Sequence, residues 1–355
     1  MLTFYNEHHV QHVARAIGRT HAGAHAGAPS DRPDAVTAVL RECERRGLGA
    51  IVTPHGVSPV TLERVHSPRY LHFLRTAWSE WIALDPTNAT PDASFDALPV
   101  AWPVRTLRSD VEPDAFVARL GLYSTDCVTP LTAGTWIAAK TGADCAVNAA
   151  HALRRGERGT FALTRPPGHH AGVDFFGGAC FLNNAALAAQ HLLDDGLERV
   201  AILDLGYHHG NGTQSIFYGR DDVLFVSLHA DPRGAWPFYA GHADETGGGA
   251  GAGYNLNIPL APGSSSAQWF AALETACVKL SMTQPQALVV SLGVDTAAAG
   301  ADVRFGLQGG DFLRLGDRIA HLGLPTVFVF EGAHAGSEPG IHAVNVLEGF
   351  ETAAE

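Results

Sequence analysis

The chain has 355 residues, of which 46% are hydrophobic and 17% charged, which is enough apolar material for a large core and too little charge for a disordered chain. Lys and Arg number 24 against 36 Asp and Glu, giving a formal net charge of −12 at pH 7. A surface of this sign repels phosphate backbones and excludes nucleic-acid binding as the main function. The sequence contains no run of about 18 apolar residues, the length that a helix needs to cross a membrane. The N-terminus lacks a secretory pattern and the five cysteines form no CxxC pair, so we expect a reduced, cytoplasmic protein.

The first 130 residues predict few regular elements. A helix is expected over 34–47, which begins after an acidic cap and ends at a glycine, and another over the aromatic-rich stretch 67–84. Four prolines within 85–110 predict a long loop there. Five histidines near the N-terminus follow no spacing that would place them on one face, so we expect them to be solvated: His8, His9, His12, His21 and His25.

From residue 134 onward, apolar runs of strand length alternate with segments of helical period. The strands are predicted at 160–163, 200–205, 223–228, 287–293 and 326–330, and helices at 184–195, 267–280 and 311–321. Continuous apolar strands alternating with helices predict an α/β fold with a mainly parallel central sheet sandwiched by helices. We expect one domain over 1–355.

Four polar clusters follow the ends of these strands, at 165–170, 204–214, 292–296 and 331–334. The carboxyl edge of a parallel sheet is where sites form in such folds. A lone histidine is more often structural than functional, but two His-His pairs at two strand ends are difficult to explain as core residues. They could supply general bases and metal ligands together, which favours metal-assisted hydrolysis.

The motifs RPPGHHAG, FGGACFLNN, HHGNGTQ, SLGVDT and NVLEGF, between about residues 130 and 350, resemble the histone deacetylase and acetylpolyamine amidohydrolase family, in its bacterial class II-like form. The resemblance implies an arginase/deacetylase-like fold and hydrolysis of the acyl-amide bond of acyl-lysine or an acylated amine. It also implies a catalytic zinc and a structural potassium or sodium ion. The implied partners are a small acylated amine or an acyl-lysine peptide, together with a homo-oligomer built through the insertion at about 85–130.

The resemblance also assigns roles to individual residues. His169 and His170 would act as base and acid, supported by Asp204 and Asn211, and residue 334 would stabilise the transition state. His208 and Asp295 match two of three zinc ligands. The potassium site would comprise Asp204, Gly206, His208, Ser227 and Leu228, and the substrate tunnel would be lined by Phe176, Ala179 and Trp236.

Two positions depart from the family pattern. The motif Asp-x-Asp-x-His is here Asp204-Leu-Gly206-Tyr-His208, so the middle zinc ligand is a glycine. Asp204 cannot replace it, since residues i and i+4 of a strand are about 13 Å apart. The family's tyrosine donor to the developing oxyanion is replaced by His334. Because catalytic zinc sites ordinarily use three protein ligands, we expect little or no zinc, unless His334 supplies a nitrogen ligand.

Two functions therefore remain open from the sequence. In the first, the chain is a hydrolase of this family with a degraded metal site, whose activity is weak or altered. In the second, it is an inactive pseudoenzyme that binds an acyl-amine ligand or a protein partner without turnover.

Overall fold

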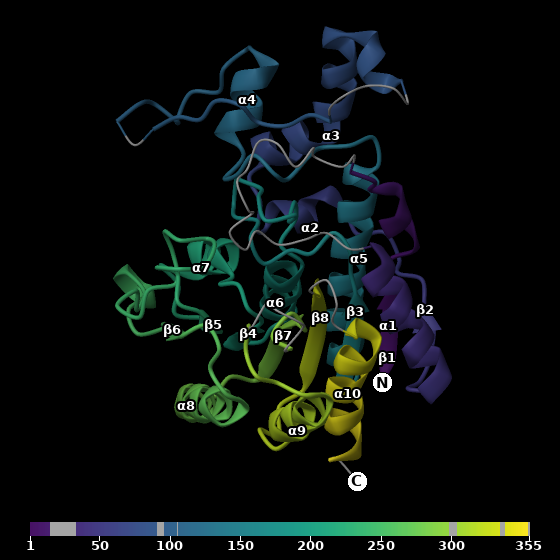
Figure 1. Cartoon of the computed structure of the whole chain (residues 1–355), viewed down its shortest axis with the longest axis vertical. Coiled ribbons are helices and arrows are strands. Elements are labelled where there is room, and N and C mark those ends of the chain that lie inside the picture. The colour runs from purple at the N-terminus through teal and green to yellow at the C-terminus, as the bar shows by residue number, and fades with distance from the viewer. Residues whose placement is uncertain (15–32, 91–95, 105, 298–303, 334–337, 354–355) are drawn as a thin grey trace.

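The computed structural model describes residues 1–14, 33–90, 96–104, 106–297, 304–333 and 338–353. Its centre is an eight-stranded sheet with the strand order β2-β1-β3-β8-β7-β4-β5-β6, in which every neighbouring pair is parallel (Figure 1). The strands are β1 (Leu2–Tyr5), β2 (Ile51–Val52), β3 (Gly159–Leu163), β4 (Val200–Leu205), β5 (Val223–Ala230), β6 (Asn255–Leu260), β7 (Ala287–Gly293) and β8 (Thr326–Gly332).

Helices cover both faces of the sheet, because the central strands are apolar on both sides. Alternate residues of β4 enter different cores: Ile202 packs in one cluster and Leu203 in the other. The first cluster contains side chains from α3 (Pro68–Leu84), α5 (Thr135–Arg154) and α6 (Asn184–Asp194). The second contains side chains from α1 (Pro33–Arg46), α8 (Ser266–Thr283), α9 (Gly309–Ala320) and α10 (Pro339–Thr352). This arrangement confirms the predicted α/β fold with a parallel sheet between helical layers.

The predicted helices begin and end within a few residues of the expected positions. Ser67 caps α3 by accepting a hydrogen bond from the amide of Tyr70, and Pro68 occupies the first helical position, where its missing N–H costs nothing. Short helices complete the chain: α2 (Pro59–Glu63), α4 (Phe116–Leu122), α7 (Asn211–Phe217), and the 3₁₀ turns η1 (Glu7–Gln11), η2 (Pro86–Ala89) and η3 (Gly249–Gly251).

The N-terminal segment differs from its expected structure. β1 inserts between β2 and β3, and two of the histidines that follow it are buried rather than solvated: His9 is 0% and His12 is 1% exposed. The Arg165 guanidinium donates hydrogen bonds to the carbonyl oxygens of both. The prediction was wrong for these two residues because the arginine that fixes them lies over 150 positions away. His21 and His25 lie outside the described residues.

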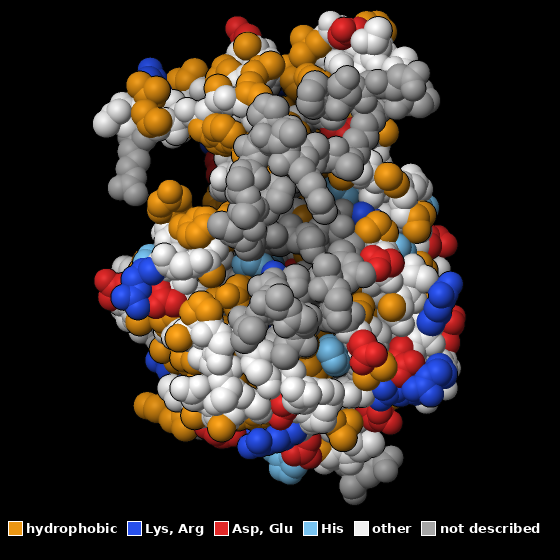
Figure 2. Space-filling model, viewed as in Figure 1, with side chains coloured by type: hydrophobic (Ala, Val, Ile, Leu, Met, Phe, Trp, Pro, Cys, Tyr) orange, Lys and Arg blue, Asp and Glu red, His pale blue; other side chains and the backbone are white. Residues whose placement is uncertain are grey.

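The insertion at about 85–130, with a loop expected over 85–110, carries η2 inside that range and α4 beyond it, and it presents apolar side chains to solvent. Figure 2 shows apolar side chains gathered at the end of the molecule where Figure 1 places α3 and α4. The exposed apolar residues of the segment are Val100, Trp102, Val104, Leu107, Val111 and Val117. Among the helices described, none combines the length and apolarity needed to span a bilayer.

Candidate active site

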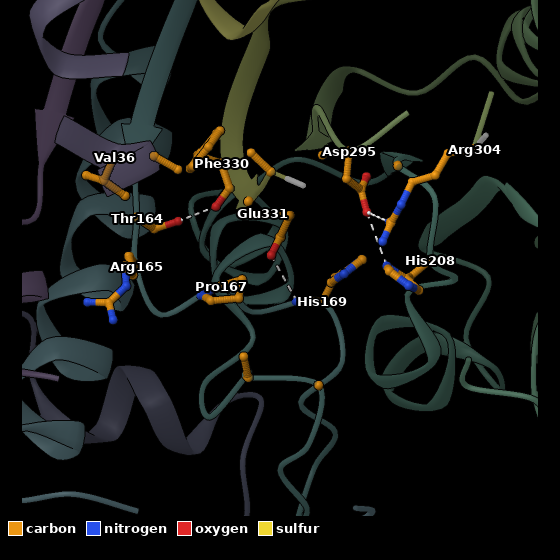
Figure 3. Close-up of a pocket in the computed structure, with 17 residues that line it drawn as sticks. Val36, Thr164, Arg165, Pro167, His169, His208, Asp295, Arg304, Phe330 and Glu331 are labelled. Atoms are coloured by element: carbon orange, nitrogen blue, oxygen red, sulfur yellow. Dashed lines mark hydrogen bonds and ion pairs between the residues drawn. The ribbon is translucent and has the colours of Figure 1, made fainter. Parts of the chain in front are cut away.

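The first half of the site is a loop that follows β3 and carries His169 and His170. The buried Glu331, at the end of β8, holds this loop by accepting hydrogen bonds from the amides of Gly168 (2.6 Å) and His169 (3.1 Å) (Figure 3). Ser291 on β7 donates to the other oxygen of the same carboxylate, at 3.1 Å. Burial raises the pKa of Glu331, while the charge of His169 and the Gly168 amide oppose that shift. Three adjacent strands thus fix the position of the histidine pair.

Each histidine of the pair has its own partner. Nδ1 of His169 lies 3.1 Å from an oxygen of Asp204, at the end of β4. Nδ1 of His170 lies 2.9 Å from Oδ1 of Asn211, the first residue of α7. Since an amide oxygen only accepts, Nδ1 of His170 carries the proton and the neutral ring keeps its lone pair on Nε2. Nε2 of His170 is buried and has no hydrogen-bond partner within the described part of the chain, so it can accept a hydrogen bond from a ligand or a water.

Two glycines of the HHGNG segment allow these partners to approach. A Cβ at Gly210 would lie 1.9 Å from an oxygen of Asp204, so a side chain there would push the carboxylate away from His169. A Cβ at Gly212 would lie 2.3 Å from the carbonyl oxygen of Ala171. Both positions therefore require glycine for close approach.

The two histidines differ in ionisation. Burial alone would lower the pKa of His169, but the carboxylate of Asp204, aided by Glu331 and Asp295, outweighs burial and raises it to about 9. The pKa of His170 is lowered well below 6.5 by burial and by the neighbouring His169. Burial raises the pKa of Asp204, opposed by the charge of His169. At neutral pH, His169 is therefore a charged donor and His170 a neutral acceptor.

We expect ¹⁵N NMR of the imidazole nitrogens to show this difference directly. His169 should give the spectrum of an imidazolium at pH 7 and lose its proton only as the pH rises through about 9, while His170 should stay neutral throughout. In an Asp204→Asn variant the largest stabilising charge is gone while burial remains, so the pKa of His169 should fall from about 9. A neutral His169 at pH 7 in the unmodified chain would contradict this electrostatic picture.

The second half of the site contains the residues expected to bind zinc, on the loops after β4 and β7. Nδ1 of His208 lies 3.1 Å from Oδ2 of Asp295. The Arg304 guanidinium reaches the same oxygen, also at 3.1 Å, while the amide of Tyr207 donates to Oδ1 at 2.8 Å (Figure 3). Burial would raise the pKa of Asp295, but the hydrogen bond and charge of His208, together with Arg304, hold it far below its usual value.

Gly206 faces this group, as the sequence pattern predicts, and brings no side chain to it. Its φ lies outside the left-handed region, so the backbone there does not require glycine. A Cβ would lie 3.3 Å from Oδ1 of Asp295, close enough to need a small shift and no more. The glycine at this position is therefore not a demand of the fold.

The donor set does not fit a catalytic zinc ion. In the part of the chain that the structure describes, no group of three or more His, Cys, Asp or Glu side chains could hold a metal. The cationic guanidinium of Arg304 already contacts Asp295, and like charges about 4 Å apart repel by about 4 kcal/mol per pair of unit charges at an effective dielectric of about 20. His334, the other residue considered as a ligand, lies outside the described residues.

The residues expected to hold potassium come together along β4 and β5. Asp204 pairs in register with Ser227, and Leu205 with Leu228, so Asp204, Ser227 and Leu228 lie next to one another on adjacent strands. The hydroxyl of Ser227 lies 2.8 Å from Nδ1 of His229. Gly206 and His208 follow directly on β4. Binding of an ion by this group stays a prediction.

The three residues expected to line a substrate tunnel occupy different places. Ala179 lines the cavity that also contains His169, His208, Asp295 and Arg304. Trp236 packs edge-on against His170, with 4.2 Å between the ring centroids. Phe176 is 0% exposed and lies in the core beside Phe73 and Phe181, so as placed it offers no surface to a ligand.

The loop that carries Ala179 is held by Asp126 and Thr129. A carboxylate oxygen of Asp126 accepts a hydrogen bond from the amide of Gly178 at 2.6 Å, and the Thr129 hydroxyl accepts one from the amide of Ala179 at 3.0 Å. Ala179 has a φ of +63°, a conformation that costs a residue with a side chain about 1 kcal/mol. A small residue in a strained turn thus forms this side of the cavity.

Sequence reasoning missed two functional contacts. Nothing in the spacing of the motifs singles out Arg304, which follows an unremarkable stretch of alanine and glycine. The role of Glu331 as the anchor of the histidine loop was also not predicted, although the residue was within a noted cluster.

Comparison with known proteins agrees with this geometry. The histone deacetylase domain matches residues 28–339. The chain is 47% identical to acetylpolyamine amidohydrolase 2 of Pseudomonas aeruginosa over 351 residues, covering 99% of both chains, and 40% identical to the acetylpolyamine amidohydrolase of Mycoplana ramosa over 329 residues, covering 92% of this chain and 94% of the relative. It superposes on a crystal structure of acetylpolyamine aminohydrolase from Burkholderia pseudomallei with a TM-score of 0.89 at 36% identity, covering 99% of each chain. Since these similarities extend over nearly the full length, the chain belongs to the histone deacetylase family.

Proposed function

We propose that the chain is a deacetylase-family amidohydrolase that acts on a small acylated amine, or on acyl-lysine, with weak or altered activity. Its relatives named acetylpolyamine amidohydrolase support an acetylated amine as the substrate class. One observation carries the altered activity. His208 and Asp295, two of the three expected zinc ligands, are hydrogen-bonded to each other, Asp295 also accepts a hydrogen bond from Arg304, and the third position is a glycine.

The acid–base part of the site is better preserved. We propose that neutral His170 accepts a proton through Nε2 and that charged His169 donates one to the leaving amine. This assignment is the reverse of the order expected from the sequence, because only His169 has a carboxylate partner. Asp204 and Asn211 keep their proposed roles as supports that fix ring orientation.

The alternative is a pseudoenzyme that binds an acyl-amine ligand or a protein partner without turnover. The specific observation in its favour is the same ion pair, since a site in which a side chain already neutralises Asp295 has no need of a metal. Assembly into homo-oligomers through the insertion at about 85–130 stays a prediction. The exposed Val104, Leu107 and Val111 would give such a contact apolar surface.

Metal content and turnover together test the proposed function. Protein purified without chelator should contain well below one zinc per chain by elemental analysis, and should hydrolyse an N-acetylated diamine or acetyl-lysine slowly. A binding signal for the acetylated amine with no turnover at all would select the pseudoenzyme. One zinc per chain with rapid hydrolysis would show that both readings of the metal site are wrong.

A further inference from the structure

Three hydrogen-bond donors converge on the carboxylate of Asp295, whose side chain is 15% exposed. His208 and Arg304 both reach Oδ2 at 3.1 Å, and the amide of Tyr207 reaches Oδ1 at 2.8 Å. The Arg304 side chain is only 8% exposed, so the guanidinium is part of the interior of the site and not a surface group that passes by. Figure 3 shows it extending toward Asp295 and His208.

Packing fixes the guanidinium in this position. Its central carbon lies 4.6 Å from the centroid of the Tyr207 ring, an arrangement in which the ring face attracts the cation. Phe305, the next residue, is fully buried and packs against the same ring at 5.2 Å. The Tyr207 ring thus contacts both the Arg304 guanidinium and the neighbouring Phe305, and this packing keeps the charged end of Arg304 at the carboxylate.

Arg304 and Asp295 form an ion pair in the half of the site where zinc is expected. The family pattern has two carboxylates, whose summed charge a divalent cation would neutralise. Here one carboxylate is absent, at Gly206, and the remaining one, Asp295, is matched by the single positive charge of Arg304. A divalent ion beside this pair would meet a guanidinium that already occupies an oxygen of Asp295, and the ion and the guanidinium would repel each other.

We propose that Arg304 is a tethered cation that replaces the divalent metal of the site: it pairs with Asp295, which in turn contacts His208, and it excludes a metal ion from the pocket. This inference deepens the proposed function and rests on it. Loss of the ligand at position 206 and the presence of the arginine are then two parts of one change. An aspartate restored at 206 would face a guanidinium as well as any added ion, so the ligand alone would not restore metal binding.

Cobalt titrations of a small set of variants test the proposal, since Co²⁺ bound by protein ligands has a visible absorption spectrum that Zn²⁺ lacks. Gly206→Asp alone should bind Co²⁺ weakly. Gly206→Asp with Arg304→Met should bind it at least ~100-fold more tightly, because a unit charge beside the ligands has been removed. Gly206→Asp with Arg304→Lys, which keeps the charge, should show no gain. The matched control is Gly206→Asp with Arg318→Met. Arg318 lies on α9 and forms an ion pair with Glu274 of α8, so this change should also show no gain.

Two results would overturn the proposal. One is Gly206→Asp binding Co²⁺ as tightly as the double variant, and the other is an equal gain from the lysine variant. If the methionine variant does not fold, Arg304→Gln takes its place, because glutamine is neutral and can still donate to Asp295. These comparisons concern affinity within the Gly206→Asp background, so they can fail while the proposed function stands, and the zinc content and turnover of the unmodified chain test that function separately.

Discussion

A variant carrying Gly206→Asp, Arg304→Met and His334→Tyr is expected to hydrolyse an N-acetylated diamine at least ~100-fold faster than the unmodified chain. The first change supplies the carboxylate that the family pattern has at this position, and the backbone accepts it, since a Cβ there would meet Asp295 at 3.3 Å. The second removes the cation beside Asp295. The third supplies an oxyanion donor, and a donor of this kind contributes about 10²–10³-fold to the rate. The ratio kcat/KM for release of acetate measures the gain.

The histidine pair provides the control for this gain. Adding His170→Ala to the triple variant should reduce the rate by about 10²–10⁴-fold, since His170 is the proposed proton acceptor. A triple variant that binds one zinc per chain and yet reacts no faster than the unmodified chain would contradict descent from a working hydrolase. It would favour a pocket that has been adapted to binding.

Gly212→Ala is expected to lower the free energy of unfolding by about 3 kcal/mol or more, at the upper end for overpacking of a core. The new Cβ would lie 2.3 Å from the carbonyl oxygen of Ala171 and 2.5 Å from the carbonyl carbon of His170. That backbone has little freedom to move, because Asn183 donates to the Ala171 carbonyl at 2.9 Å and the Thr213 amide donates to the His169 carbonyl at 3.1 Å. Equilibrium denaturation by urea measures the loss.

Gly219→Ala is the matched control. The nearest atom to its added Cβ would be the carbonyl oxygen of Gly248 at 3.9 Å, and its φ lies outside the left-handed region. This substitution should change the stability by less than about 0.5 kcal/mol. If Gly212→Ala also lost less than about 1 kcal/mol, the histidine loop would be free to shift, and Gly212 would not be a close-approach position.

The sequence alone was sufficient for the central strands and for the proximity of the histidine pair to Asp204 and Asn211. Runs such as 200–205 and 287–293 are apolar on both faces, a pattern typical of a strand buried between two layers. His169 follows β3 and Asp204 lies at the end of β4, so the parallel sheet brings them to the same edge. The edge strands β2 and β6 gave no such signal. β2 has only two residues, and in β6 only Asn255 and Asn257 are buried.

The glycine at position 206 was also evident from the sequence, because a missing side chain can be recognised without coordinates. Which side chain pairs with Asp295 beside this glycine was decided only by the tertiary structure. Arg304 lies nine residues after Asp295, and Glu331 lies more than 160 residues after the amides that it holds. A sequence pattern records which residues are apolar and where the chain turns, but the direction of a long side chain depends on what packs around it. In this protein that packing, with Tyr207 beneath the guanidinium, places a positive charge at Asp295, a position where the family pattern has a metal ligand.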